Sequence, residues 1–334
     1  MATRLGSGYL RAGDGRRSDG SVLDRESHRR DTAGDRNGAC SRGGYAAGSR
    51  ARSGRGNRDQ SVRARGQGRG NCCSLVWNRH DVNPRTAAVF DAARTQQRSA
   101  LIGYLPAGFP TVDDSVEIFQ TMLDSGVDLL EVGLPYSDPL MDGPAIQESV
   151  EIALECGVTT ADVLSVVDRL TPAEGQAVYV MSYWNPIERF GVQKFADELA
   201  AAGGSGVITP DLTPEEADAW IEVTEAAGID RTFLVAPSST DARIDIVSGA
   251  TTGFVYAAST MGVTGTRDTV SDAAPQLVGR VRERTGQPIG VGLGVSSAEQ
   301  AASIAGYADG VIVGSAFIRR VLDAESSTEA TAEV

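Results

Sequence analysis

The sequence predicts an α/β protein built as a single (β/α)8 barrel, a TIM barrel, with a leading helix before the first strand. From about residue 82, eight short apolar segments alternate with longer amphipathic ones, as in βα units around a parallel sheet. The apolar segments are nearly free of charge, as strands covered on both faces are. The roughly 250 residues that hold this pattern are the usual length of such a barrel. A doubly wound open sheet uses the same elements, so the number of strands decides the interpretation.

Each element follows from its local pattern. Residues 86–96 form the leading helix, with Ala, Val and Phe on one face. Thr111 begins one later helix, and Thr213 followed by Pro214 begins another. Ser296 and Glu299 have the spacing of a capping box. The eight expected strands are 100–105, 127–132, 177–181, 206–209, 232–235, 253–257, 289–292 and 310–313.

The first 80 residues differ in composition from the rest. They contain seventeen arginines, no lysine and seven acidic residues, whereas the remaining chain has a large excess of acids. This Arg/Gly-rich arm has few apolar residues and no periodicity, so we expect it to be disordered. We divide the chain into the arm at 1–80, a catalytic barrel at 81–325 and a disordered tail at 326–334. A mis-assigned start, with translation beginning near Val82, is the explanation of the arm that we favour.

Composition also excludes several classes of function. An arm that binds nucleic acid needs aromatic side chains to stack on bases, and only Tyr9, Tyr45 and Trp77 occur there. The chain has no apolar run long enough to span a bilayer and no signal peptide, so we expect a cytoplasmic protein that binds no membrane. Cys156 is the one cysteine after the arm, and both histidines precede the barrel, which excludes cysteine and histidine metal sites in it.

A single acidic residue interrupts the second expected strand. Strand alternation places Glu131 on one face together with Leu129 and Gly133, and we assign that face to the inside of the barrel. A carboxylate there is unfavourable unless it is paired or protonated. The alternative is a structural glutamate that bonds to the backbone or to a neighbouring side chain.

The loop after this strand is stiffened by prolines. Pro135, Pro139 and Pro144 each fix a backbone angle, so Asp138 and Asp142 are held in place. Turn formation or helix capping is the alternative role of these acids.

Glycine-rich turns after the last three strands suggest a phosphate site. Small residues let backbone N–H groups approach a phosphate, and barrels often bind phosphate after strands seven and eight. Ordinary turn glycines are the alternative. The expected phosphate-binding residues are Thr264, Gly265, Gly294, Gly314 and Ser315.

Several segments together resemble one family. The string LLEVGLPYSDPLMDGPAIQ is similar to the signature segment of tryptophan synthase alpha chains. LIGYLPAGFPT, MSYWNP, TPDLTPEE, GVTGTR, GVGLGVSS and VGSAF follow the family's loop positions in order, and the similarity covers roughly residues 86–322.

The resemblance implies a lyase of tryptophan biosynthesis that cleaves indole-3-glycerol phosphate into indole and glyceraldehyde 3-phosphate. It implies Glu131 as general acid and base, Asp142 as the carboxylate beside the indole N–H, and Tyr256 near Glu131. Barrel packing is the alternative role of Tyr256. The loop that carries Thr264 closes over the site in this family. The expected indole pocket consists of Tyr104, Met181, Tyr183, Ile208, Leu234 and Leu293, each of which could equally be ordinary core.

The resemblance also implies a partner. The family binds a β subunit that carries pyridoxal phosphate in an α2β2 heterotetramer, and this chain needs no cofactor of its own. Asp138, Pro139 and Asn185 are placed to face that subunit, and Asp211 matches a family acid. Two residues depart from the pattern, since Met141 stands where many relatives have Ala and Thr260 where some have Arg.

Two other functions remain open. A non-catalytic, phosphate-binding regulatory barrel would not need Glu131 and Asp142, and a standalone indole-forming lyase would have no β partner. Schiff-base aldolases and isomerases of sugar phosphates require an active-site lysine, and Lys194, the lone lysine, lies on an expected helix.

Overall fold

The computed structural model describes residues 82–258, 273–292, 294–295 and 297–323. The expected arm, the tail and the domain boundaries that depend on them lie outside these ranges. So do Thr264, Gly265 and Leu293.

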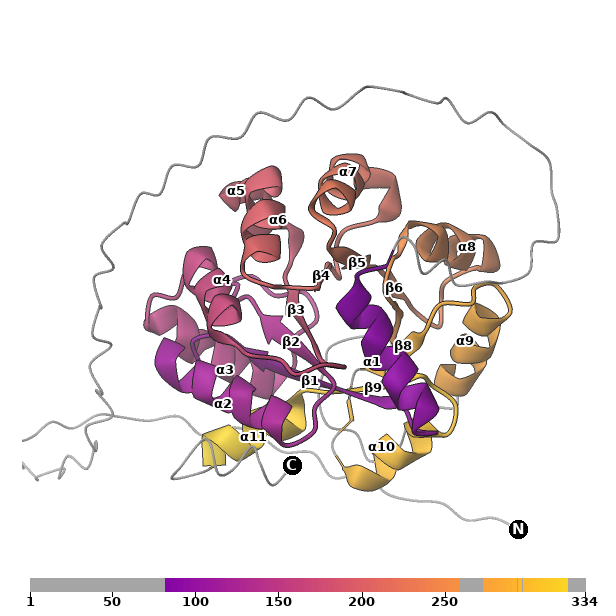
Figure 1. The fold of residues 1–334 in the computed structure, drawn as a ribbon, viewed down its shortest axis with the longest axis horizontal. Coiled ribbons are helices and arrows are strands. Elements are labelled where there is room, and N and C mark those ends of the chain that lie inside the picture. The colour runs from indigo at the N-terminus through magenta and orange to yellow at the C-terminus, as the bar shows by residue number, and fades with distance from the viewer. Residues whose placement is uncertain (1–81, 259–272, 293, 296, 324–334) are drawn as a thin grey trace, which may run out of the picture. The chain divides into compact units, whose positions relative to one another are not determined.

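The described strands form one parallel sheet that curls into a nearly closed barrel (Figure 1). Their hydrogen-bonded order is β5-β4-β3-β2-β1-β9-β8-β7-β6. The two end strands, β5 and β6, are separated in sequence by Phe233 alone, so the chain itself joins the ends of the sheet. The strands are β1 Ala100–Pro106, β2 Leu129–Gly133, β3 Ala177–Met181, β4 Gly206–Ile208, β5 Asp230–Thr232, β6 Leu234–Val235, β7 Val255–Ala258, β8 Ile289–Gly292 and β9 Gly310–Val313.

The (β/α)8 prediction is therefore confirmed, with one correction. The expected fifth strand at 232–235 is two short strands, because its first half pairs with β4 and its second half with β7. It also begins earlier than expected, at Asp230.

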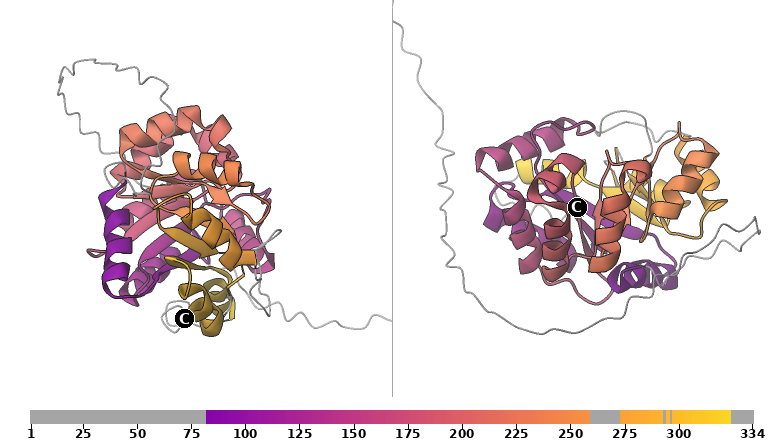
Figure 2. Two further views of the ribbon diagram at one scale, coloured as in Figure 1. Left: turned by 90° about the vertical axis from the view of Figure 1, so that its right-hand side faces the viewer. Right: turned by 90° about the horizontal axis from the view of Figure 1, so that it is seen from above.

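Helices surround the barrel (Figure 2). The expected leading helix is present, and Thr111 caps α2 by accepting a hydrogen bond from the backbone of Asp114. Two expectations about helix starts were wrong. The residue that caps α10 is Ser297 and not Ser296. Pro214 opens a short 3-10 turn and not an α-helix. The helices are α1 Pro84–Thr95, α2 Val112–Asp124, α3 Pro144–Glu155, α4 Thr160–Arg169, α5 Trp184–Phe190, α6 Val192–Ala201, η2 Pro214–Glu216, α7 Asp218–Ala227, α8 Asp241–Ala250, α9 Ala273–Arg282, α10 Ala298–Ala305 and α11 Ser315–Asp323.

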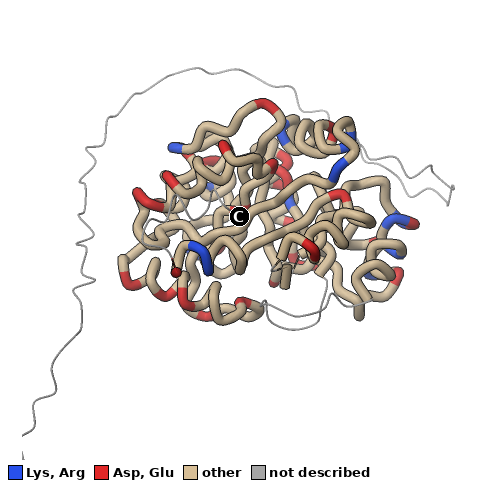
Figure 3. The backbone as a smooth tube through the Cα atoms, turned by 90° about the horizontal axis from the view of Figure 1, so that it is seen from below, with Lys and Arg blue, Asp and Glu red and all other residues tan. Residues whose placement is uncertain are grey.

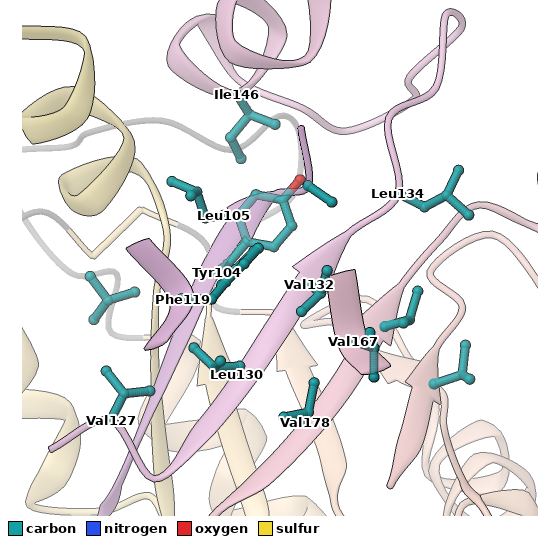
Figure 4. Close-up of a cluster of buried hydrophobic side chains, with 14 of the residues drawn as sticks. Tyr104, Leu105, Phe119, Val127, Leu130, Val132, Leu134, Ile146, Val167 and Val178 are labelled. Carbon is teal, nitrogen blue, oxygen red and sulfur yellow. The ribbon is translucent and has the colours of Figure 1, made fainter. Parts of the chain in front are cut away.

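Two apolar layers hold the barrel together. The larger layer lies between the strands and the surrounding helices, and Figure 4 shows part of it, including Leu130 on β2 and Val178 on β3. Acidic residues are spread over the helices (Figure 3), in keeping with the excess of acids after the arm.

The smaller layer fills the inside of the barrel. It joins side chains such as Ile102 of β1 and Phe254, the residue before β7, to Val89 and Phe90 of α1. The rings of Phe90 and Phe254 lie 5.8 Å apart between centroids. Helix α1 therefore closes the end of the barrel at which the strands begin.

A buried polar network lies at this closed end. Asp230, which is 1% exposed, accepts a hydrogen bond from Tyr179 at 2.9 Å and another from the backbone of Asn83 at 3.1 Å. The oxygen of Thr86 lies 2.9 Å from that of Tyr179. Burial raises the pKa of Asp230, and these hydrogen bonds act in the opposite direction. The network ties α1 to β3 and β5.

Candidate active site

A cavity opens where the strands end, opposite α1. Its walls come from β1, β2, β3, β4, β6, β7 and β9, from the loop after β2 with the start of α3, and from the turns after β8 and β9 with the start of α11. The lining residues are Tyr104, Glu131, Met141, Asp142, Ile146, Met181, Ile208, Leu234, Tyr256, Gly294, Val295, Ile312, Gly314 and Ser315.

Glu131 lies on the inner face of β2, as strand alternation predicts. It pairs in register with Tyr104 on one side and Tyr179 on the other, and it is 1% exposed. Its Oε1 atom has no hydrogen-bond partner among the residues that the structure describes. Burial raises the pKa of Glu131 to about 8, because the charged form loses its hydration there.

Asp142 lies in the loop between β2 and α3 and is 7% exposed. Its Oδ1 accepts a hydrogen bond from the hydroxyl of Tyr183 at 3.0 Å. Its backbone carbonyl accepts another from the side chain of Gln147 at 2.7 Å. Burial raises the pKa of Asp142, and the bond from Tyr183 lowers it. The two carboxyl groups therefore differ: one has a donor and the other has an unpaired oxygen.

Two buried tyrosines lie in the cavity wall. Burial raises the pKa of both Tyr104 and Tyr256 well above the ordinary value, so both hydroxyl groups are protonated. Each ring occupies space that a neighbouring glycine leaves free. A Cβ on Gly133 would lie 2.7 Å from the Tyr104 hydroxyl, and one on Gly292 would collide with that of Tyr256. Gly292 thus makes room for a tyrosine.

The turns after β8 and β9 line the same cavity through Gly294, Gly314 and Ser315. Gly294 has a φ of +93°, a conformation that residues with a side chain rarely adopt. The carbonyl of Gly314 accepts a bond from the backbone of Ile318 at 3.1 Å, so α11 begins there. The N–H groups in the first turn of a helix have no partner within the helix, so such a turn can bind an anion. The other two expected phosphate ligands, Thr264 and Gly265, lie outside the described residues.

The expected indole pocket is brought together in part. Tyr104, Met181, Ile208 and Leu234 line the cavity, and Leu293 lies outside the described residues. Tyr183 is not among the lining residues; its hydroxyl bonds to Asp142 instead. Sequence reasoning did not place Met141, Ile146, Val295 and Ile312 in the wall. Ile312 has a signal that could have found it, because alternation along β9 puts it on the same face as Gly310 and Gly314.

A second hollow lies beside the loop after β2. It is lined by Ser137, Asp138, Asn185 and Arg189, among others. The side-chain amide of Asn185 donates to the hydroxyl of Tyr136 at 3.1 Å. The expected partner-facing residues Asp138 and Asn185 therefore lie on one surface.

Nothing in the described ranges offers a cluster of three or more ligands for a metal ion. Over the same residues, the helices are too short or too polar to cross a bilayer.

Comparisons with known proteins agree with one another. The family model for tryptophan synthase alpha chains matches residues 90–334. The chain is 57% identical to the tryptophan synthase alpha chain of Mycobacteroides abscessus over 249 residues, which are 75% of this chain and 95% of that protein. A solved structure of Mycobacterium tuberculosis tryptophan synthase is similar with a TM-score of 0.70 and 52% identity, over 75% of this chain and 96% of that one. A crystal structure of the tryptophan synthase alpha chain of Legionella pneumophila is similar with a TM-score of 0.68 and 30% identity, over 75% of this chain and 93% of that one.

Proposed function

Because this chain belongs to the tryptophan synthase alpha chain family, we propose that its cavity cleaves indole-3-glycerol phosphate into indole and glyceraldehyde 3-phosphate, with Glu131 as general acid and base. The observation that carries the proposal is the Glu131 carboxyl group, buried, with one unpaired oxygen, in the wall of a cavity that Asp142 shares.

The reaction is a retro-aldol cleavage, and its protons must balance. A proton is added to C3 of the indole ring, and the hydroxyl on the adjoining carbon loses one. The bond between these two carbons then breaks, its electron pair returns to the ring, and the hydroxyl carbon becomes the aldehyde. One carboxyl group in reach of both positions can donate the first proton and accept the second. Glu131 suits this role because a pKa of about 8 keeps it protonated at pH 7.

Asp142 has the complementary role. Protonation at C3 leaves positive charge on the ring, and much of it falls on the nitrogen. A fixed carboxylate that accepts the indole N–H stabilises that charge most strongly when the surroundings exclude water. The hydrogen bond from Tyr183 favours the charged form of Asp142 against the effect of burial. Two acids in different environments can hold different protonation states.

The remaining walls fit the rest of the substrate. Met181, Ile208 and Leu234 give the flat aromatic ring an apolar slot. Gly294, Gly314 and Ser315 line the same cavity, and we expect their backbone N–H groups and the N-terminus of α11 to bind the phosphate. Thr264 and Gly265 complete this phosphate site in the proposal. Tyr256 lines the same cavity as Glu131, and in the proposal its ring helps to exclude water from that carboxyl group.

The partner belongs to the proposal as well. We expect a β subunit that carries pyridoxal phosphate to dock on the surface that holds Asp138, Pro139 and Asn185, and to consume the indole. This chain then needs no cofactor, since general acid and base catalysis suffices for its own step.

The experiment is an assay of indole formation from indole-3-glycerol phosphate, with and without the cognate β subunit. The proposal predicts indole release by the chain alone and stimulation when the β subunit is added. Release without stimulation would indicate a standalone lyase. No release under either condition would contradict the catalytic assignment and favour a regulatory barrel.

A further inference from the structure

We propose that Tyr183 is a positioning residue, which holds Asp142 and the loop before it in the geometry that the reaction needs. This inference rests on the proposed role of Asp142. It assigns Tyr183 a different task from the indole contact that the sequence suggested.

The Tyr183 hydroxyl takes part in three hydrogen bonds to consecutive residues of one loop. Its oxygen accepts from the backbone N–H of Leu140 at 3.1 Å and from that of Met141 at 3.2 Å. Backbone amides can only donate, so the hydroxyl proton is left for Asp142, whose Oδ1 lies at 3.0 Å. One side chain thus fixes the loop backbone and aims the carboxylate that follows it.

Tyr183 is itself held firmly. It is 4% exposed, and its ring lies 5.5 Å from that of Tyr136 between centroids. It is the residue before α5, and the backbone N–H of the next residue, Trp184, donates to both carboxylate oxygens of Asp211 at 2.9 and 3.1 Å. Asp211 therefore fixes the start of α5, and Tyr183, which precedes that helix, fixes Asp142 in turn.

The part of the loop that Tyr183 holds lies between the surface and the cavity. Leu140 is 71% exposed, and Met141 contributes to the cavity wall. Without the hydroxyl, two backbone N–H groups would lose their acceptor, and Asp142 would lose its side-chain donor. The other titratable groups of the described chain that share the cavity wall with Asp142 are Tyr104, Glu131 and Tyr256, and none of them donates a hydrogen bond to Asp142 there.

The test is Tyr183→Phe, which removes the hydroxyl and keeps the ring. We expect kcat for indole release to fall roughly 10- to 100-fold, as small misplacements of catalytic groups do, while KM changes less than about threefold. Affinity for indole-3-propanol phosphate, which lacks the reacting hydroxyl, should change equally little. Tyr307→Phe is the control, because it makes the same chemical change far from the cavity and should leave kcat unchanged.

A double-mutant cycle separates positioning from general damage. If Tyr183 acts through Asp142, Tyr183→Phe should have little further effect on kcat in an Asp142→Asn background. An equal loss in both backgrounds would overturn the proposal, as would wild-type kcat in Tyr183→Phe alone.

A second readout does not depend on turnover. In the substrate-free protein, Tyr183→Phe should raise the pKa of Asp142, measured by carbon NMR of aspartate side chains, because the bond from Tyr183 stabilises the charged form. An unchanged pKa would contradict the inference. Should the wild-type chain release no indole, the proposed function fails, and this titration still decides whether Tyr183 sets the state of Asp142.

Discussion

Each end of the barrel buries a carboxyl group, and the two groups differ in their hydrogen bonding. At the closed end, Asp230 accepts hydrogen bonds from Tyr179 and from the backbone of Asn83. At the open end, Glu131 is buried to the same degree, yet its Oε1 has no partner in the described chain. The first carboxylate is satisfied by the fold, and the second is left available for a substrate.

The comparison shows how a buried acid can be assigned a role. An unpaired buried polar atom costs about 1–3 kcal/mol of stability. Proteins tolerate such a cost mainly at functional sites, where local rules are broken for the sake of chemistry. Asp230 stabilises the packing of α1 against the barrel. In our account the unpaired carboxyl group of Glu131 lowers the stability of the fold, and it is kept because it transfers protons.

The largest effect should come from the open end. Glu131→Gln keeps the size of the side chain and removes the titrating proton, so we expect kcat for indole release to fall by about 10²- to 10⁴-fold. Affinity for indole-3-propanol phosphate should be nearly unchanged, because in our proposal the carboxyl group acts only on the reacting atoms. Steady-state kinetics and calorimetric binding measure the two quantities. Near-normal turnover would remove Glu131 from the mechanism.

The closed end should show the opposite pattern. Asp230→Ala leaves the Tyr179 hydroxyl and the Asn83 N–H without an acceptor, so we expect the free energy of unfolding to fall by about 2–4 kcal/mol. Turnover of the folded variant should remain within about twofold of the wild type. Urea unfolding and the indole assay test this. If turnover falls and stability does not, the division between the two ends is wrong.

The smallest predicted effect concerns the turn after β8. Gly294→Ala forces a side chain into a backbone conformation with φ of +93°, at a penalty of about 1–2 kcal/mol. We expect KM to rise roughly tenfold with little change in kcat, because in our proposal the turn contacts the phosphate and not the reacting carbons. Gly279→Ala on α9 is the matched control, since that glycine has open space beside it and lies in a helix. An unchanged KM would exclude Gly294 from substrate binding.

Much of this arrangement could be predicted from the sequence. The strands that begin at Ala177, Ile289 and Gly310 have the predicted bounds, because short apolar runs between turn residues mark buried parallel strands clearly. The inward direction of Glu131 follows from alternation along a single strand. The order of the turns along the chain likewise predicts that Gly294 and Gly314 lie at the same end of the barrel.

Other features could not be predicted, because they depend on contacts between distant segments. Asp230 precedes the apolar run of its strand, so it looks like a turn residue until Tyr179 is seen beside it. The position of Tyr183 is similar: sequence places it after β3, but whether its hydroxyl enters the cavity or reaches Asp142 depends on the path of another loop. The break at Phe233 arises from barrel closure, which local patterns do not encode.

A titration of Glu131 tests the central claim most directly. The carboxyl stretching band that is present in the wild type and missing from Glu131→Gln can be followed by infrared difference spectroscopy from pH 5 to 9. Since the pKa is raised, the protonated form persists above the ordinary range and disappears as the pH rises. Our account predicts a midpoint near 8. A Glu131 that is already ionised at pH 6 would contradict it.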